Sequence, residues 1–152
     1  KVNILVIHQL PMKNYIADKI TSMMKVITFG TFDLYHVGHV RLIKGCSLYG
    51  EVIVGLSSDE FNIKKKGRTP VYDYESRKEI LESNKHVTKV FKEDSMEKKR
   101  EYILEHGADI LIMGSDWEGK FDEFKDICQV IYLTRTPEVS TTGTISICKT
   151  SI

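Results

Sequence analysis

Short apolar runs alternate along the chain with stretches in which apolar residues recur at helical spacing. The runs are rich in β-branched residues and are bounded by turn-forming residues, a pattern typical of buried strands. They predict five strands, at residues 25–29, 51–57, 87–91, 109–114 and 129–133.

The segments between these runs predict helices. Residues 38–50 have apolar residues at helical spacing and reach Gly50, a residue type that commonly ends helices. Asp59 opens a short helical stretch through Phe61, and residues 64–70 predict a basic loop punctuated by Gly and Pro. Further helices are expected at about 74–83 with Asp73 as cap, at 95–107 with Ser95 as cap, and at 121–128.

This alternation predicts an α/β fold, a doubly wound parallel sheet with helices on both faces. In such sheets ligands bind beyond the carboxyl ends of the strands, where loops and helix N-termini converge. The distinctive loops follow the first, fourth and fifth strands, at residues 30–39, 114–120 and 134–142. We therefore expect residues far apart in the sequence to meet at one edge of the sheet.

Composition narrows the range of partners. The 152 residues suffice for one domain, and 22 Lys and Arg against 21 Asp and Glu leave a net charge of +1. This balance gives no argument for nucleic acid or an acidic membrane, so an anionic ligand needs a local cluster. Three scattered cysteines suit a reducing cytoplasm. No apolar run reaches the roughly 20 residues of a membrane span, and His8 and Gln9 argue against a signal peptide.

Two histidines stand between the first strand and the first helix. Taken alone, His36 and His39 are expected to be core or capping residues, and a metal site lacks further ligands at a familiar spacing. Gly38 permits close backbone approach, and the helix N-terminus directs N–H groups toward the sheet edge. With the hydroxyl of Thr31, these residues predict an anion site in which two imidazoles donate to phosphate oxygens.

The chain after the fifth strand carries a second candidate anion site. Arg135 offers a planar fork of donors that matches phosphate, and Ser140 or Thr141 is placed to begin another helix. The alternative is a capped terminal helix beside a surface arginine.

Two other segments have both a functional and a structural interpretation. The basic run Lys64, Lys65, Lys66 and Arg68 is either a solvated loop or a cover over a triphosphate. Asp116 and Trp117 follow a buried strand and are expected to bind a ribose hydroxyl or shape a base pocket. Packing between loop and helix is the alternative for Trp117.

Assembled, these residues resemble the cytidylyltransferases, and most closely the bacterial glycerol-3-phosphate cytidylyltransferases. The matching segments occur in the family's order and are "GTFDLYHVGH", "SSDEFN", "YESRKEILE", "MGSDWEGKFD" and "RTPEVSTT". The HxGH motif alone indicates only the wider nucleotidylyltransferase superfamily, whereas the last two segments are more specific. The resemblance implies a Rossmann-like domain over residues 24–152, with residues 1–23 as an N-terminal extension of unknown role.

The resemblance implies transfer of CMP from CTP to a phosphorylated alcohol, with release of pyrophosphate and formation of a CDP-linked precursor for a surface polymer or lipid head group. Glycerol 3-phosphate is the first expectation. A polyol phosphate, phosphoethanolamine or a phosphorylated amino-acid derivative is the alternative acceptor. A silent nucleotide-binding module is a further alternative, and zinc binding or adenylyl transfer is less favoured. The resemblance also implies Mg²⁺ bound with CTP, no metal held by the chain itself, and a cytoplasmic homodimer.

The resemblance also implies roles for particular residues. His36 and His39 would hold α- and β-phosphate oxygens, while Lys65 and Arg135 would neutralise the leaving pyrophosphate. Asp33 would orient its loop or act on Mg²⁺, and Arg77 and Lys85 would bind the acceptor. The nucleotide-binding residues would be Gly30, Thr31, Phe32, Asp33, Gly38, Gly114, Asp116, Trp117, Thr136, Ser140 and Thr141.

Departures from the family pattern fall on the acceptor side. Ser115 replaces one of two acidic residues, and Lys85 replaces an arginine, which loses the bidentate geometry of the guanidinium. Thr88 stands for an aspartate and Met96 for a tryptophan, and the basic loop is slightly longer. The sequence therefore predicts an intact cytidine half and an altered acceptor half.

Overall fold

The computed structural model describes residues 16, 19, 20, 23–135, 141, 142, 145 and 149. Its five parallel strands form one sheet in the order β3-β2-β1-β4-β5. The strands are β1 (Lys25–Gly30), β2 (Glu51–Ser57), β3 (Val87–Glu93), β4 (Ile110–Gly114) and β5 (Gln129–Leu133). Both the predicted fold class and the strand positions are confirmed. The strand order reverses between β1 and β4, and ligands of doubly wound sheets bind at such a switch point.

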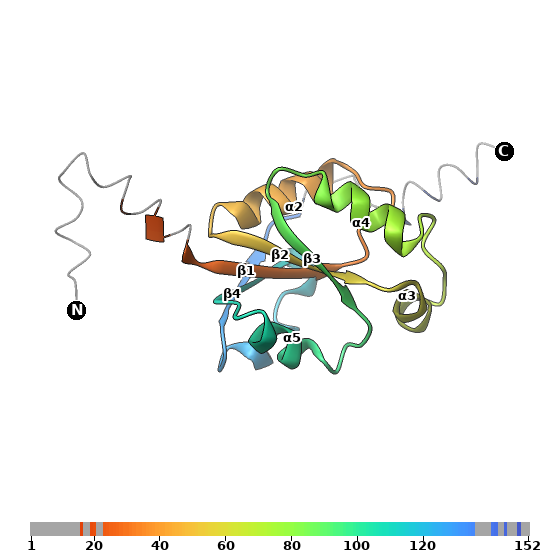
Figure 1. Cartoon of the computed structure of the whole chain (residues 1–152). Coiled ribbons are helices and arrows are strands. Elements are labelled where there is room, and N and C mark those ends of the chain that lie inside the picture. Colours follow the sequence, from red (N-terminus) through yellow and green to blue (C-terminus); the bar gives the residue numbers. More distant parts are fainter. Residues whose placement is uncertain are drawn as a thin grey trace.

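Helices cover both faces of the sheet, as Figure 1 shows. On one face, α2 (Val37–Ser47) and α4 (Tyr74–Glu82) bury a core that includes Ile43, Leu81 and Val54. On the other face, α5 (Lys99–Glu105) and the short helix η3 (Asp122–Phe124) pack in a second core. The remaining elements are α3 (Asp59–Lys66), which follows β2, and η2 (Ser115–Trp117), which follows β4.

Four predicted helices have wrong boundaries, and three of them follow β2. Helix α3 continues past Phe61 to Lys66, so the three lysines lie on a helix and not in a loop. Helix α5 begins at Lys99, because the Ser95 hydroxyl donates to the Glu97 carboxylate and makes no cap. Of residues 121–128, only Asp122–Phe124 form a helix, of the 3-10 type.

Helix α2 also ends earlier than predicted, with Leu48 as its C-cap. Gly50 has a different function, because a Cβ there would lie 2.3 Å from the Met24 carbonyl oxygen. The glycine therefore permits the close approach of the turn before β2 to the start of β1.

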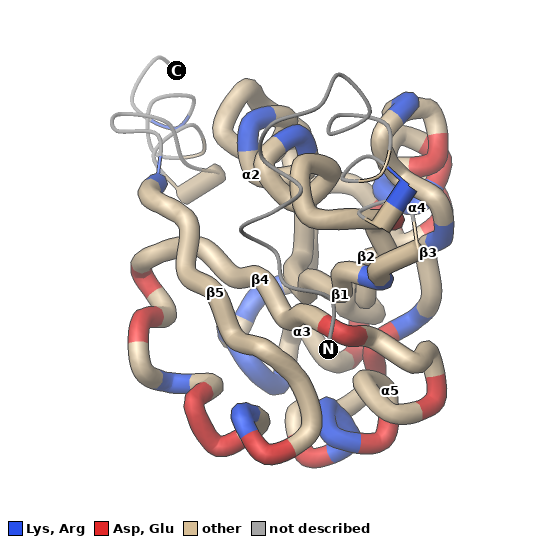
Figure 2. Tube along the Cα trace, turned by 90° about the vertical axis from the view of Figure 1, so that its left-hand side faces the viewer, with Lys and Arg blue, Asp and Glu red and all other residues tan. Residues whose placement is uncertain are grey.

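Charges of both signs are interspersed along the trace in Figure 2, in keeping with the balanced composition. Within the described ranges, no helix has the length and apolar character needed to cross a membrane. Residues 1–15 and most of the chain after Arg135 lie outside the described residues, so the proposed extension over residues 1–23 stays an expectation.

Candidate active site

A cavity of about 520 Å³ opens at the carboxyl ends of the central strands, at the switch point between β1 and β4. This volume lies within the range of small-molecule sites. The cavity brings together most of the predicted residues, namely Gly30, Thr31, Phe32, Asp33, His36, Gly38, His39, Gly114, Asp116, Trp117, Arg135 and Thr141. Thr136 and Ser140 lie outside the described residues.

The two histidines cap helix α2 and line the cavity at the same time. The Nδ1 atom of His36 accepts the Gly38 N–H at 3.1 Å, and the Nδ1 atom of His39 accepts the His36 N–H at 3.2 Å. A ring nitrogen that accepts carries no proton, so each neutral imidazole has its proton on Nε2. The capping interpretation was therefore correct, and it leaves both Nε2–H groups available as donors.

The surroundings of the histidines favour the neutral form of both rings. Burial, followed by the charges of His36 and Lys66, lowers the pKa of His39 to about 3, against the opposing effect of Asp33. Burial and the nearby charge of Arg135 lower the pKa of His36. Neutral rings protonated on Nε2 can donate hydrogen bonds to phosphate oxygens, but they have no free Nε2 lone pair with which to act as a general base.

Asp33 orients the loop after β1. Its buried carboxylate accepts backbone N–H groups from Leu34 at 3.0 Å, Val71 at 2.6 Å and Tyr72 at 2.9 Å. The flanking residues Phe32 and Leu34 have φ angles of 49° and 46°, a region that residues other than glycine rarely occupy. The three hydrogen bonds hold this strained turn against the segment before α4. They favour the loop-orienting role of Asp33 over a role as a metal ligand.

Thr31 contacts a neighbouring side chain. Its hydroxyl donates to the Asn62 amide oxygen at 2.6 Å, and the Asn62 amide nitrogen donates to the Arg68 carbonyl at 2.9 Å. Both Thr31 and Asn62 are buried. The pair therefore fixes α3 and the chain after it against the end of β1.

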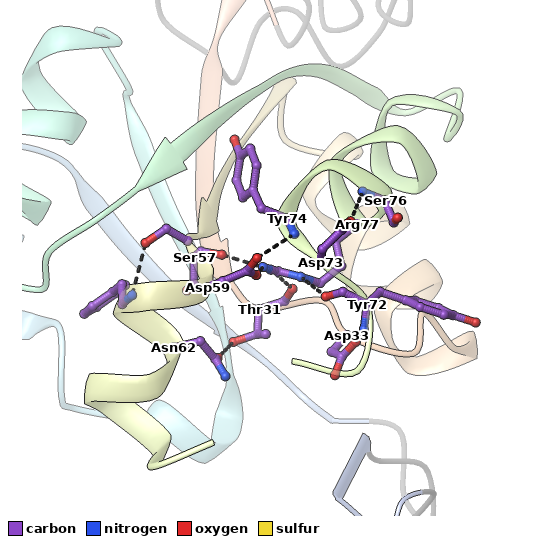
Figure 3. Close-up of polar contacts among 12 residues, drawn as sticks. Thr31, Asp33, Ser57, Asp59, Asn62, Tyr72, Asp73, Tyr74, Ser76 and Arg77 are labelled. Carbon is purple, nitrogen blue, oxygen red and sulfur yellow. Dashed lines mark hydrogen bonds and ion pairs between the residues drawn. The ribbon is translucent and has the colours of Figure 1, made fainter. Parts of the chain in front are cut away.

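Arg77 is a structural residue in this fold, contrary to the expectation that it grips the acceptor. Its side chain is fully buried, and Figure 3 shows the guanidinium enclosed by its partners. Its nitrogens donate to the carbonyls of Tyr72 at 2.9 Å, Thr31 at 2.8 Å and Ser57 at 2.9 Å, and to the Asp59 carboxylate at 2.6 Å. A substrate phosphate could reach this guanidinium only by displacing these partners.

The cations that line the cavity near α3 differ from the one that was predicted. The Nζ atom of Lys65 donates to the Ser57 hydroxyl at 2.7 Å, and Lys65 is not among the residues lining the cavity. Lys66 and Arg68 line it instead. The Arg68 guanidinium lies 3.3 Å from the Thr142 hydroxyl, which connects the end of α3 to the C-terminal segment.

Arg135 borders the cavity opposite α3. Its guanidinium lies 2.5 Å from the Asp116 carboxylate, and its backbone N–H donates to the Ser115 hydroxyl at 3.2 Å. Both partners of the ion pair are about half exposed, so the pair contributes little stability and can exchange for a phosphate. Ser115, a departure from the family pattern, therefore ties the loop after β4 to the end of β5.

Trp117 combines its two alternative roles. Its ring lines the cavity, and it also packs on Phe121 with ring centroids 5.5 Å apart.

Lys85 lies away from the site. It is exposed just before β3, at the amino ends of the strands, whereas the cavity lies at their carboxyl ends. The position of Lys85 therefore gives no support within this chain to the prediction that it binds the acceptor.

Nothing in the described part of the chain forms a metal centre, because no group of three or more His, Cys, Asp or Glu side chains gathers there. Asp33 uses its carboxylate for backbone N–H groups, and Asp116 is paired with Arg135. These residues do not fit a protein-held Mg²⁺.

Sequence reasoning missed the apolar wall of the cavity. Leu42 of α2 and Leu133 of β5 line it, together with Phe29. Their sequence signal is that of ordinary core residues, so only their position at the strand ends could have identified them.

A Rossmann-like sheet with histidines and cations around a cavity at its switch point fits a nucleotidyltransferase, and sequence comparison identifies this class. The chain belongs to the cytidylyltransferase-like family, whose profile matches residues 27–146. It is 47% identical over 121 residues to the glycerol-3-phosphate cytidylyltransferase of Bacillus subtilis (strain 168), covering 79% of this chain and 93% of that protein. The protein of the same name from Staphylococcus aureus (strain NCTC 8325 / PS 47) is 46% identical, with coverages of 79% and 91%.

A solved structure shares the fold. The lipopolysaccharide core biosynthesis protein from Thermoplasma volcanium GSS1 superposes with a TM-score of 0.62 at 20% identity, covering 74% of this chain and 98% of that one. At this identity the likeness concerns the fold alone.

Proposed function

We propose that the protein transfers CMP from CTP to glycerol 3-phosphate, forming CDP-glycerol and pyrophosphate. The observation that carries the proposal is the cavity, in which two neutral imidazole donors lie with the cations Lys66, Arg68 and Arg135. The names of the relatives at 46% and 47% identity support glycerol 3-phosphate as the acceptor.

The reaction is an in-line displacement at phosphorus. An oxygen of the acceptor phosphate forms a bond to the α-phosphorus of CTP, and the bond from that phosphorus to the oxygen bridging to the β-phosphate breaks. A phosphate monoester is already ionised near neutral pH, so no general base is needed. The Nε2–H groups of His36 and His39 donate to α- and β-phosphate oxygens as charge develops, and each such donor is worth about 3 kcal/mol in the transition state.

The leaving pyrophosphate is assigned to three cations of the cavity. Lys66 and Arg68 approach from the end of α3, and Arg135 approaches from the end of β5. CTP enters as its magnesium complex, so Mg²⁺ arrives with the substrate. Arg135 exchanges its contact with Asp116 for phosphate oxygens, which leaves the Asp116 carboxylate available for the cytidine ribose.

Lys65 is assigned to the acceptor phosphate. An in-line displacement places the acceptor and the pyrophosphate on opposite sides of the α-phosphorus. Lys66 lines the nucleotide cavity, whereas Lys65 on the same helix points to Ser57 at the end of β2. This assignment replaces the expectation that Lys65 neutralises pyrophosphate.

The positions at which the chain departs from the family pattern do not argue against glycerol 3-phosphate as the acceptor. Ser115 maintains the contact between two cavity loops. Lys85 and Thr88 are exposed near the amino ends of the strands, away from the cavity. Met96 is exposed in the loop before α5 and is not among the residues lining the cavity.

The test is pyrophosphate release from CTP and Mg²⁺ with glycerol 3-phosphate, ribitol 5-phosphate or phosphoethanolamine, with the product mass determined. ATP in place of CTP is the nucleotide control. Release that requires CTP and is fastest with glycerol 3-phosphate supports the proposal. Faster release with another acceptor would identify that compound as the substrate in place of glycerol 3-phosphate. CTP binding without turnover would show that the protein is a nucleotide-binding module and not an enzyme.

The proposal also includes three expectations: the protein is cytoplasmic, it forms a homodimer, and it does not bind nucleic acid. Light scattering of the purified protein, combined with a nuclease-treated control, tests the oligomeric state. A monomer that is fully active would remove the dimer from the proposal.

A further inference from the structure

A chain of polar contacts runs from the half-buried Lys65 on α3 to the buried Lys99 on α5. Lys65 donates to the Ser57 hydroxyl at 2.7 Å, and this hydroxyl lies 3.4 Å from Oε1 of Glu93. The other oxygen, Oε2, accepts from Lys99 at 2.6 Å. Glu93 and Lys99 are only 1% and 3% exposed, so the ion pair has almost no contact with water.

The strands and helices hold these groups in register. Ser57 and Glu93 are direct partners at the carboxyl ends of β2 and β3, and the Ser58 N–H donates to the Glu93 carbonyl at 2.9 Å. Lys99 is the first residue of α5, and its Nζ atom lies 4.0 Å from the centroid of the Phe29 ring. Because Phe29 also lines the cavity, the Lys99 end of the polar chain lies against a residue of the cavity wall.

Stability alone does not explain why the Glu93 carboxylate is buried. An apolar pair of similar volume is often as stable as a buried ion pair, and burial disfavours both charges. Burial raises the pKa of the Glu93 carboxyl and lowers that of the Lys99 ammonium, and their mutual contact opposes both shifts. One carboxylate is thus shared between two lysines, with Lys99 in direct contact and Lys65 reached through the Ser57 hydroxyl.

We propose that Glu93 is a positioning residue that acts through Ser57 to hold the Lys65 ammonium in place and in its charged form. This inference rests on the proposed function, in which Lys65 receives the acceptor phosphate. Glu93 itself is shielded by Lys99 and Ser57 and does not touch the substrate.

The direction of the effect follows from the groups that face Lys65. Burial lowers the pKa of Lys65 to about 8, and Lys66 on α3, Lys99 on α5 and Arg77 on α4 add to this decrease. Glu93 on β3 is the group that raises it. Removing the carboxylate charge therefore lowers the pKa of Lys65 further, so more of Lys65 loses its charge between pH 7 and 8.

The direct test is a titration of Lys65 in the substrate-free protein. Lysines are labelled by reductive ¹³C-methylation, and the Lys65 signal is assigned by its absence in Lys65→Arg. In Glu93→Gln, the midpoint of this signal is expected to fall by roughly one pH unit or more. Glu97→Gln is the matched control, because it removes the same charge from an exposed site four residues later, in the loop that follows β3, and the Lys65 midpoint stays unchanged.

The matching activity test is the pH profile of kcat/KM for the acceptor, in which the decrease at high pH (the alkaline limb) reports the loss of charge on Lys65. In Glu93→Gln this limb moves to lower pH with the NMR midpoint, and a one-unit shift from about 8 gives roughly a fivefold loss at pH 8. The KM for CTP stays unchanged. A residue with only a structural role would lower the melting temperature without moving the limb.

If Glu93→Gln does not fold, a second variant that keeps the ion pair between Glu93 and Lys99 provides the test. Ser57→Ala leaves Glu93 and Lys99 in contact, removes the link to Lys65, and is expected to shift the midpoint in the same direction. An unchanged midpoint in the folded variants overturns the proposal. A shifted midpoint in a protein without CTP turnover supports the positioning network and overturns the proposed function instead.

Discussion

The imidazole rings of His36 and His39 stack with centroids 3.7 Å apart, and the Nδ1 atom of each accepts a backbone N–H at the start of α2. Each ring therefore has two separate uses. One nitrogen caps the helix, and the other is left with the proton that a phosphate oxygen accepts. Capping residues and phosphate ligands were alternative interpretations of these histidines; the geometry confirms the caps and is compatible with the phosphate role.

This division allows the two uses of His39 to be separated. In His39→Asn, the amide oxygen can replace Nδ1 as acceptor of the His36 N–H, but the donor at Nε2 is lost. We expect kcat to fall roughly 100-fold, the scale of one lost transition-state donor, with an almost unchanged melting temperature. His39→Ala loses the cap as well and is expected to be about 1 kcal/mol less stable. A loss of kcat below about fivefold in His39→Asn would remove His39 from the mechanism.

Stability should depend on pH through the same ring. The folded His39 has a pKa of about 3 against 6.5 for an unperturbed histidine, because burial disfavours its charged form. Between these values the unfolded chain binds more protons, so the free energy of unfolding decreases as the pH is lowered from 6.5 toward 3. Melting curves of the wild type and His39→Asn at several pH values test this. If the two proteins lose stability in parallel, carboxylates cause the loss and not His39.

Arg77 is expected to act through stability. Arg77→Met removes the guanidinium from three carbonyls and Asp59, and the buried partners left unpaired cost about 3 kcal/mol or more. Urea unfolding measures this loss. Arg100→Met is the matched control, since its ion pair with Asp126 is largely exposed and contributes little to stability. A selective increase in the KM of the acceptor, with unchanged stability, would restore the acceptor role of Arg77.

The lysines of α3 should differ sharply in their effect on CTP. Lys66 lines the cavity and Lys64, two residues earlier on the same helix, does not. Lys66→Ala is expected to weaken CTP binding roughly tenfold, the loss of one charge-assisted contact, whereas Lys64→Ala leaves it unchanged. Calorimetric titration with CTP measures both, and equal losses would show that only the overall charge of α3 matters.

The three central strands were predictable because they are buried on both faces. The Ile and Val runs of β1, β2 and β4 therefore have few polar positions to obscure them. The loop motifs were predictable because the strand ends of a parallel sheet share one edge, which brings Asp116 and Arg135 to the same cavity as His36.

The directions of the charged side chains were not predictable. Consecutive residues on a helix point about 100° apart, so Lys64, Lys65 and Lys66 face different surroundings, and the cavity faces only the last of them. Which lysine lines the cavity depends on where α3 begins, and that is set by the cap that Ser58 forms with the Phe61 N–H. Two of the carbonyls that enclose Arg77, those of Thr31 and Ser57, come from distant strand ends, so the sequence of its own helix does not reveal its burial.

The order of the strands has a consequence for how the chain folds. Strand β1 pairs with β2 directly, but its other neighbour, β4, lies far along the sequence, with Val26 opposite Ile110. A nascent chain that has completed β3 contains both histidines, yet one edge of β1 is bare and prone to aggregate. The cavity exists only after β4 and β5 have joined, so CTP stabilises the completed domain and not its first half.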